Sequence, residues 1–439
     1  MKTEEAFFIS AGRLIDPLLR RDEEPADLYV AEGKIVDPAN YPKDFPWTKI
    51  DAQGLIILPG LTDMHVHLRE PGESRKETIR TATMAAAAGG ITTVVAMPNT
   101  IPPADHPDTI AWIRKKVEKE ALVKVYPTGC LTEDRLGEKL APFQSLIQAG
   151  AIALTDDGSC VQNARIMRRA MEYASVLGVP ILDHCEDTAL SDGGVMNEGL
   201  WSTLLGLPGW PSIAEELIVS RDILLCEKTG AKIHLQHLTT EGSIRLLRDA
   251  KKRGLPVSAE VCPHHIALTE SALKEYDPRF KMNPPLRTQK DREALIEALV
   301  DGTVEVIASD HAPHARFEKE VEFEKAPFGV VGLETLVAVC LKELYYSKKM
   351  ELVDLFAKLT VGPSRVLGLE PPSLRYGSPA DLILLDLNAS WQVDSKAFFS
   401  KGKNTPFEGM NLKGKVVLTM IDGKIVWREK RLVEEQKTV

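Results

Sequence analysis

The chain has 439 residues, of which 44% are hydrophobic and 27% charged, and its formal net charge is −9. These proportions are typical of a globular protein, and the length fits one large domain with a smaller one. The acidic balance disfavours nucleic acid and anionic membranes as partners. No signal-peptide pattern stands at the N-terminus, and the most apolar stretch, residues 84–97, is too short to cross a bilayer. The six cysteines form no CxxC pair, so we expect reduced thiols and a cytoplasmic location.

The central part of the chain alternates short apolar runs with helix-like stretches. Eight runs have the composition of strands, namely residues 61–65, 92–97, 124–127, 151–155, 180–183, 232–236, 257–261 and 304–308. Helical patterns between them include residues 76–88, 164–177, 214–228 and 241–253. Repeated strand–helix units predict a parallel sheet, and eight of them predict a closed (β/α)8 barrel of the α/β class.

Both flanks of this region contain short strands joined by turn-forming residues. Residues 7–10 and 27–30 precede the first barrel strand, and residues 381–385 and 416–421 follow the last barrel helix. We therefore expect the two ends of the chain to pair in one small β domain beside the barrel. In this division residues 1–54 and 371–439 form the small domain, and residues 55–370 form the barrel.

Metal-binding residue types stand at the ends of five of the predicted strands. They are His65, His67, Asp157, His184, His237 and Asp310. A His-x-His pair on a strand directs both imidazoles to one face, and the C-terminal strand ends of such barrels form one rim. Four imidazoles and two carboxylates on that rim suit one or two divalent metal ions, zinc above all. They predict metal-assisted hydrolysis.

Taken alone, each of these residues has a simpler interpretation. A single histidine at a strand end is more often a hydrogen-bonded structural residue, and Asp157 could cap a helix or form a turn. Their common position at one end of the strands favours the joint metal site. His264 and His265 follow the seventh predicted strand without a motif partner, so we expect a structural role for them.

Five motifs make the chain resemble the dihydroorotases of the amidohydrolase superfamily, of the bacterial class I type. They are DMHVHLREPG at 63–72, AMPNT at 96–100, TDDG at 155–158, KMNPPLR at 281–287 and ASDHAPH at 308–314. The resemblance spans nearly the whole chain and implies a TIM-like barrel with a small β-sandwich domain built from both termini. It also implies the zinc-dependent, reversible cyclisation of N-carbamoyl-L-aspartate to L-dihydroorotate in pyrimidine (UMP) biosynthesis.

The metal bridge departs from that of many relatives in this superfamily, which hold two metals with a carboxylated lysine after the fourth strand. No lysine occurs between Ala141 and Glu227, and Asp157 stands in the corresponding place. We expect one zinc bound by His65, His67, Asp157 and Asp310. A second metal would share Asp157 and use His184 and His237, so the number of metals stays open.

The expected chemistry follows from the bound zinc, which lowers the pKa of its water to about 7. The resulting hydroxide would attack the ring amide carbonyl of dihydroorotate, which the metal polarises. Asp310 would act as general acid and base, taking a proton from the water and returning it to the leaving nitrogen. The steps reverse in the biosynthetic direction.

The substrate carboxylate needs a cationic or amide-bearing cradle. Arg69, two residues beyond His67, is expected on the same strand face and offers a bidentate fork. The resemblance adds substrate contacts from His67, Asn99, Asn283, His314, Phe328 and Gly329, the last two as a backbone cover. Simpler interpretations are an ion pair of Arg69 with a nearby glutamate, and turn roles for the two asparagines, which each adjoin a proline.

The highly charged residues 315–325 lie between His314 and the predicted cover at Phe328. They form either a solvated surface segment or a mobile cover that excludes water, and the sequence does not choose between them.

Two other functions stay open. A related cyclic amidase, such as a dihydropyrimidinase, hydantoinase or allantoinase, would share the barrel and the His-x-His pair, but the missing lysine and Arg69 argue against it. An inactive dihydroorotase-like scaffold for aspartate transcarbamoylase is disfavoured by the full ligand set. Subgroup resemblance also implies a complex of the active enzyme with aspartate transcarbamoylase, and we expect a homo-oligomer acting on a small molecule.

Overall fold

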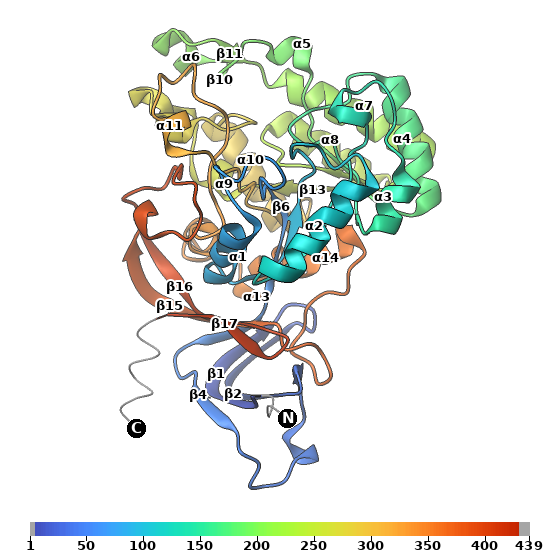
Figure 1. The fold of residues 1–439 in the computed structure, drawn as a ribbon. Coiled ribbons are helices and arrows are strands. Elements are labelled where there is room, and N and C mark those ends of the chain that lie inside the picture. The colour runs from blue at the N-terminus through green and yellow to red at the C-terminus, as the bar shows by residue number, and fades with distance from the viewer. Residues whose placement is uncertain (1–4, 430–439) are drawn as a thin grey trace.

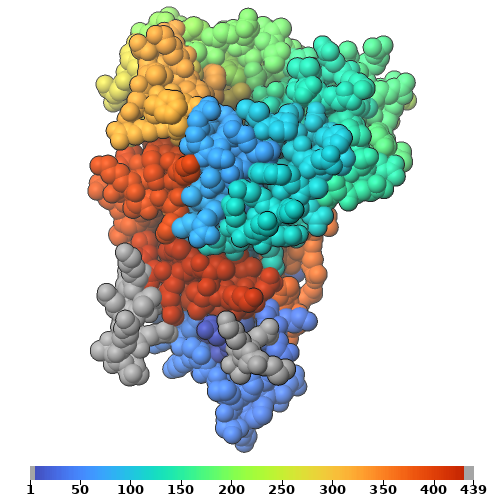
Figure 2. All heavy atoms as spheres, viewed as in Figure 1, coloured from blue at the N-terminus to red at the C-terminus, as the bar shows by residue number. Residues whose placement is uncertain are grey.

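The computed structural model describes residues 5–429, which form a (β/α)8 barrel and a small β-sandwich domain (Figure 1). The predicted fold class is confirmed. Figure 2 shows the last strands, in red, between the barrel and the first strands, in blue. Among the helices of residues 5–429, none combines the length and the apolar character needed to cross a bilayer.

The barrel wall consists of two parallel sheets joined at two seams. One contains β6 (Leu61–Val66), β7 (Ile91–Ala96) and β8 (Lys124–Pro127), and the other β9 (Ile181–Asp183), β12 (Ile233–Leu235), β13 (Val257–Val261) and β14 (Val306–Ile307). At one seam Leu154 bridges Gly129 and Ile181, and at the other His311 bridges Val66, all in parallel. The predicted strand at 151–155 therefore occupies its place in the wall, but only Leu154 forms bridges there.

Helices cover the outside of the wall. The longer ones are α1 (Ile79–Ala88), α2 (Pro107–Glu120), α4 (Ala164–Leu177), α7 (Ile213–Thr229), α8 (Glu241–Lys252) and α10 (Gln289–Val300). Shorter ones are α3 (Phe143–Ala149), α12 (Leu336–Cys340), α13 (Leu352–Ala357) and α14 (Val361–Leu367). The first predicted helix starts three residues late because Thr78 caps α1, its side chain accepting from the backbone N–H of Thr81.

Short elements follow the strand ends at the rim of the barrel. They are α5 (Thr188–Ser191), β10 (Met196–Asn197), α6 (Leu200–Leu205), β11 (Gly209–Trp210), α9 (Pro263–Ala267) and α11 (Arg316–Lys319). Figure 1 shows several of them, with α6 and α11 at the end of the barrel away from the sandwich domain. Of these, α11 lies in the charged segment 315–325.

Both flanks of the barrel contribute to one connected sheet in the order β17-β16-β15-β5-β1-β2-β3, with β4 beside β1. These strands are β1 (Phe7–Asp16), β2 (Arg21–Ala31), β3 (Lys34–Ile35), β4 (Thr48–Asp51), β5 (Ile56–Pro59), β15 (Leu382–Gln392), β16 (Asn411–Ile421) and β17 (Lys424–Arg428). β5 joins the two halves, since it pairs in parallel with β1 and antiparallel with β15. The predicted boundary after residue 54 remains a proposal, and β5 lies beyond it in the sequence.

Candidate metal centre and substrate site

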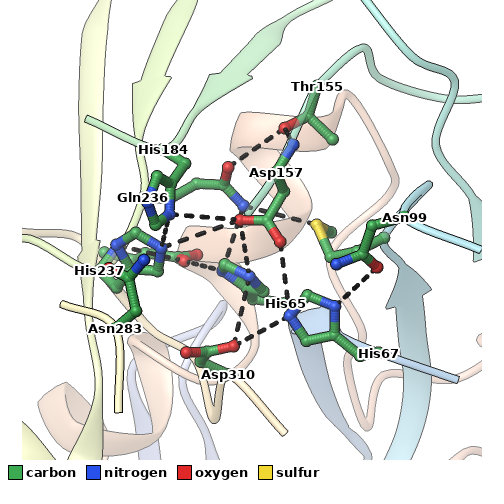
Figure 3. A network of polar contacts seen from close by, with 12 residues as sticks. His65, His67, Asn99, Thr155, Asp157, His184, Gln236, His237, Asn283 and Asp310 are labelled. Carbon is green, nitrogen blue, oxygen red and sulfur yellow. Dashed lines mark hydrogen bonds and ion pairs between the residues drawn. The ribbon is translucent and has the colours of Figure 1, made fainter. Parts of the chain in front are cut away.

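The six predicted ligands meet at the C-terminal rim of the barrel (Figure 3). They come from β6 and its end (His65, His67), from the segment after the Leu154 bridge (Asp157), and from the ends of β9, β12 and β14 (His184, His237, Asp310). Each of these residues is at most 5% exposed. Side chains up to 245 positions apart in the sequence therefore form one buried polar cluster.

The two histidines of the His-x-His pair face the two aspartates. Nε2 of His65 lies 3.2 Å from Oδ1 of Asp157 and 3.5 Å from Oδ1 of Asp310. Nε2 of His67 lies 3.4 Å from Oδ2 of Asp157 and 3.1 Å from Oδ1 of Asp310. Two imidazole nitrogens and two carboxylates thus converge on a common point.

Asp157 also faces the other two histidines. Its Oδ1 lies 3.9 Å from Nδ1 of His184 and 3.8 Å from Nε2 of His237, and these two ring nitrogens are 2.9 Å apart. The carboxylate therefore stands between the two pairs of imidazoles, where it is able to serve one metal or bridge two.

The residues present fit a bound metal ion. Nε2 of His65 and Oδ1 of Asp157 are buried and make no hydrogen bond, although they lie close together. Buried polar atoms rarely remain without a partner, and imidazole nitrogen and carboxylate oxygen are the donors that zinc takes in catalytic sites. Two overlapping groups, His65 with His67 and Asp310, and His65 with Asp157 and His237, have their ligand atoms within 4.8 Å of one another.

Backbone strain accompanies two of the ligands. His237 has φ 32° and Asp310 has φ 45°, in the left-handed region that residues other than glycine rarely adopt. Such conformations concentrate at functional sites, where surrounding contacts hold them.

Glu260 contacts two of the predicted ligands and was not identified from the sequence. Its Oε1 lies 2.6 Å from Nδ1 of His65 and accepts a hydrogen bond from the backbone N–H of His237, 3.3 Å away. Burial alone would raise the pKa of Glu260, but the neighbouring His65 and His234 outweigh it and lower the pKa to about 2. A carboxylate behind a ligating histidine fixes the ring and its tautomer.

Glu186 has the same relation to another ligand. Its Oε2 lies 2.8 Å from Nε2 of His184 and accepts a hydrogen bond from the side-chain amide of Asn283, 3.1 Å away. Burial opposes ionisation of Glu186, yet His184 lowers its pKa to about 2. The only sequence signal for either glutamate was an acidic residue close to a strand end.

Arg69 lies at the site, but not for the predicted reason. β6 ends at Val66 and Arg69 has φ 61°, so strand alternation does not place its side chain. The guanidinium is buried, its Nε donates to the carbonyl oxygen of Pro313 at 3.2 Å, and Nη1 is 3.9 Å from Oε2 of Glu73. The contact with Glu73 is long for an ion pair, which leaves donors for a ligand.

The other predicted cradle residues contact this cluster or its cover. Oδ1 of Asn99 lies 2.9 Å from Nδ1 of His67, and Nε2 of His314 lies 2.7 Å from the carbonyl oxygen of Phe328. Gly329 has φ 130°, and a Cβ there would lie 2.9 Å from Ala312. The cover therefore needs glycine at this position. Contact of these residues with substrate remains a proposal.

The charged segment 315–325 contains the short helix α11, and its Lys319 is buried. Nζ of Lys319 donates to the carbonyl oxygens of Pro278, Lys281 and Pro327 at 3.0, 3.1 and 2.7 Å. Neighbouring residues such as Phe317 and Lys325 are exposed. The segment is thus packed on its inner side and solvated on its outer face, and its role as a mobile cover stays a prediction.

Comparison with known proteins agrees with this geometry. A profile of the dihydro-orotase-like family matches residues 54–243. A dihydroorotase of Pelotomaculum thermopropionicum is 47% identical, over 96% of this chain and 98% of that protein. A dihydroorotase of Syntrophus aciditrophicus is 46% identical, over 96% and 99% of the two chains.

The chain belongs to the dihydroorotase family.

Among solved structures, the fold of this dihydroorotase family member is shared with cyclic amidases. The L-hydantoinase of Arthrobacter aurescens superimposes with a TM-score of 0.86 at 25% identity, covering 96% of both chains. A dihydropyrimidinase of Brevibacillus agri superimposes with a TM-score of 0.84 at 22% identity, covering 97% of this chain and 95% of its own. This second likeness shows the fold alone.

Proposed function

We propose that the protein is an active dihydroorotase that interconverts N-carbamoyl-L-aspartate and L-dihydroorotate in pyrimidine biosynthesis. The carrying observation is the convergence of His65, His67, Asp157 and Asp310 in one buried cluster, within a chain similar over nearly its whole length to dihydroorotases. An inactive scaffold would not need this complete set of donors.

The metal proposed for this site is zinc. His65, His67, Asp157 and Asp310 would hold one ion, and Asp157, His184 and His237 a second. A zinc ion bound there supplies a Lewis acid and makes water more acidic. Glu260 and Glu186 orient the rings of His65 and His184 from behind, and so keep the metal-facing nitrogens unprotonated.

Asp310 is the proposed general acid and base. Its side chain is buried, and its Oδ1 lies 3.1 Å from Nε2 of His67 and 3.5 Å from Nε2 of His65. This position lets the carboxylate accept a proton from the attacking water and pass it to the amide nitrogen of the opening ring. In ring closure, the carboxylate takes the proton from that nitrogen.

The substrate carboxylate is assigned to Arg69, with Asn99, Asn283 and His314 beside it. The buried guanidinium provides the positive charge, and the asparagines are already oriented by His67 and Glu186. The backbone at Phe328 and Gly329 closes over the ring, held in place by the hydrogen bond between Lys281 and Gly329. This cradle selects a ring that carries a carboxylate.

The test is an assay of the purified protein with dihydroorotate, dihydrouracil and allantoin, together with elemental analysis. We expect turnover of dihydroorotate, zinc in the protein, loss of both in His65→Ala, and loss of turnover in Asp310→Ala. Turnover of only dihydrouracil or allantoin would assign a different cyclic amidase. A metal-loaded protein inactive on all three substrates would contradict the proposal.

Further proposals concern the cellular location, the oligomeric state and a protein partner of the enzyme. We propose a cytoplasmic homo-oligomer that associates with aspartate transcarbamoylase, on the basis of the subgroup resemblance. Co-elution of the two proteins tests the complex, and scattering mass measurement tests the oligomer. Full activity of the isolated chain would show that the partner is unnecessary for catalysis.

A further inference from the structure

A second buried set of metal-binding side chains lies at the end of β13, outside the six predicted ligands. Cys262 caps helix α9, whose first turn carries His264 and His265. The three side chains are at most 3% exposed. Sγ of Cys262 and one ring nitrogen from each histidine lie within 4.8 Å of one another.

Two ring nitrogens of this cluster are buried without a hydrogen-bond partner. Nε2 of His265 lies 2.9 Å from the carbonyl oxygen of Pro284, so the nitrogen left for another ligand is Nδ1. Nδ1 of His265 and Nε2 of His264 are buried and have no hydrogen-bond partner. Buried imidazoles normally satisfy both nitrogens, and two such atoms beside a thiol indicate a missing ligand.

Another buried group of similar composition shows that clustering of such side chains does not by itself indicate a metal site. Asp183, Cys185 and Asp222 also have ligand atoms within 4.8 Å of one another. However, the guanidinium of Arg221 lies 2.8 Å from Asp222 and 3.4 Å from Asp183. That cluster already contains its cation and needs no metal ion.

We propose that Cys262, His264 and His265 bind a divalent ion of the zinc class at a second site, with a fourth position open to water and with no ligand in common with the six-ligand centre. One sulfur and two imidazole nitrogens form a borderline-to-soft ligand set, which zinc and its cobalt analogue accept. Binding releases the thiol proton to solvent and leaves a thiolate on the metal. The ion would fix α9 and, through His265 and Pro284, the segment that carries Asn283.

Cobalt substitution tests this site separately from the catalytic one. The six ligands of the catalytic centre contain no sulfur, so thiolate-to-cobalt charge-transfer absorption in the cobalt-loaded protein must come from a cysteine. We expect this absorption in the wild type and in His65→Ala, which removes the catalytic metal. We expect its loss in Cys262→Ser, while the ligand-field bands of the other site remain.

Cys185→Ser is the matched control, because Cys185 adjoins the catalytic ligand His184 and is equally buried. This variant should retain the charge-transfer absorption. Absorption that disappears in Cys185→Ser and persists in Cys262→Ser would overturn the proposal. The dihydroorotate assay is not part of this readout, so the proposed function and the second site can fail independently.

A measurement on the wild type covers the case in which Cys262→Ser does not fold. X-ray absorption of the fully zinc-loaded protein should show a sulfur scatterer at about 2.3 Å from zinc. A zinc-saturated protein with only nitrogen and oxygen scatterers would rule the site out.

Discussion

Oε1 of Glu260 lies 2.6 Å from Nδ1 of His65, on the side of the ring opposite the metal-facing nitrogen. Both side chains are completely buried, so water does not compete for this contact. If Nδ1 donates to this carboxylate, Nε2 is left with a lone pair to face Asp157 and a metal ion. We therefore expect Glu260 on β13 to influence how His65 on β6 binds a metal.

Glu260→Gln should weaken metal binding roughly 10- to 100-fold, because the neutral amide holds the histidine proton less strongly. Turnover at limiting metal should fall with it, and excess metal should restore part of the activity. Competition with a chromophoric chelator measures the affinity. Glu305→Gln is the control, since Glu305 pairs with Lys251 before β14 begins. Equal metal affinity in both variants would contradict the role of Glu260.

Arg69→Met should raise KM for dihydroorotate about 10- to 100-fold, the loss expected for a hydrogen bond to a charged group. The buried guanidinium donates from Nε to the carbonyl oxygen of Pro313 and has a long contact with Glu73 from Nη1, so the substrate is the proposed partner of its remaining donors. Metal content should stay at the wild-type value. Arg69→Lys should recover part of the binding because it keeps the charge without the fork. A wild-type KM in Arg69→Met would show that the carboxylate binds elsewhere.

Lys319→Met should loosen the cover of the site. Its ammonium joins three backbone carbonyls of two segments, and leaving buried carbonyls unsatisfied costs about 1–3 kcal/mol. We expect faster hydrogen exchange in residues 315–329 and a higher KM, with unchanged metal content. Lys325→Met is the matched control on the same segment, because Lys325 is 73% exposed. Similar exchange in both variants would show that Lys319 does not hold the cover.

Glu334 should make the stability of the protein fall as the pH rises. Burial raises its pKa from 4.5 to about 7, although the backbone N–H groups of Phe399 and Ser400 donate to it. Between these values the folded state keeps a proton that the unfolded state has lost, so the free energy of unfolding decreases through this window.

The stability of Glu334→Gln, relative to the wild type, should therefore increase by up to about 3 kcal/mol from acid pH to pH above 7. Urea unfolding of both proteins across this pH range measures the difference between their free energies of unfolding. The other titrating groups are the same in both proteins, so their contributions cancel in this difference. A difference between the two proteins that does not change with pH would show that Glu334 titrates normally in the folded state.

Much of the site could be predicted because its signals are local. Residue type and position at a strand end predicted that His184 and Asp310 lie on one rim, because the C-terminal strand ends of a closed barrel meet there. The strand at 151–155 was harder, since one bridged residue, Leu154, carries the pairing there. The apolar composition of this stretch predicts that it is buried in the wall, but it does not predict how many of its residues pair with the neighbouring strands.

The supporting residues could not be predicted because their roles depend on distant partners. Glu260 contacts a histidine 195 positions earlier, and only closure of the barrel brings them together. Arg69 does not reach its position by strand alternation, as the sequence argument assumed, because its left-handed backbone ends that alternation. His265 had no motif partner in the sequence, because it contacts the backbone of Pro284, 19 positions later.

The central place of β5 in the sandwich sheet has a consequence for synthesis on the ribosome. β5 pairs with β1 at once, but its other neighbour, β15, is translated more than 300 residues later. At usual elongation rates this delay lasts roughly 20–60 s. During that time the nascent chain exposes an unpaired strand edge, a known hazard for aggregation. Chaperone demand should thus be greatest before the final sixty or so residues emerge.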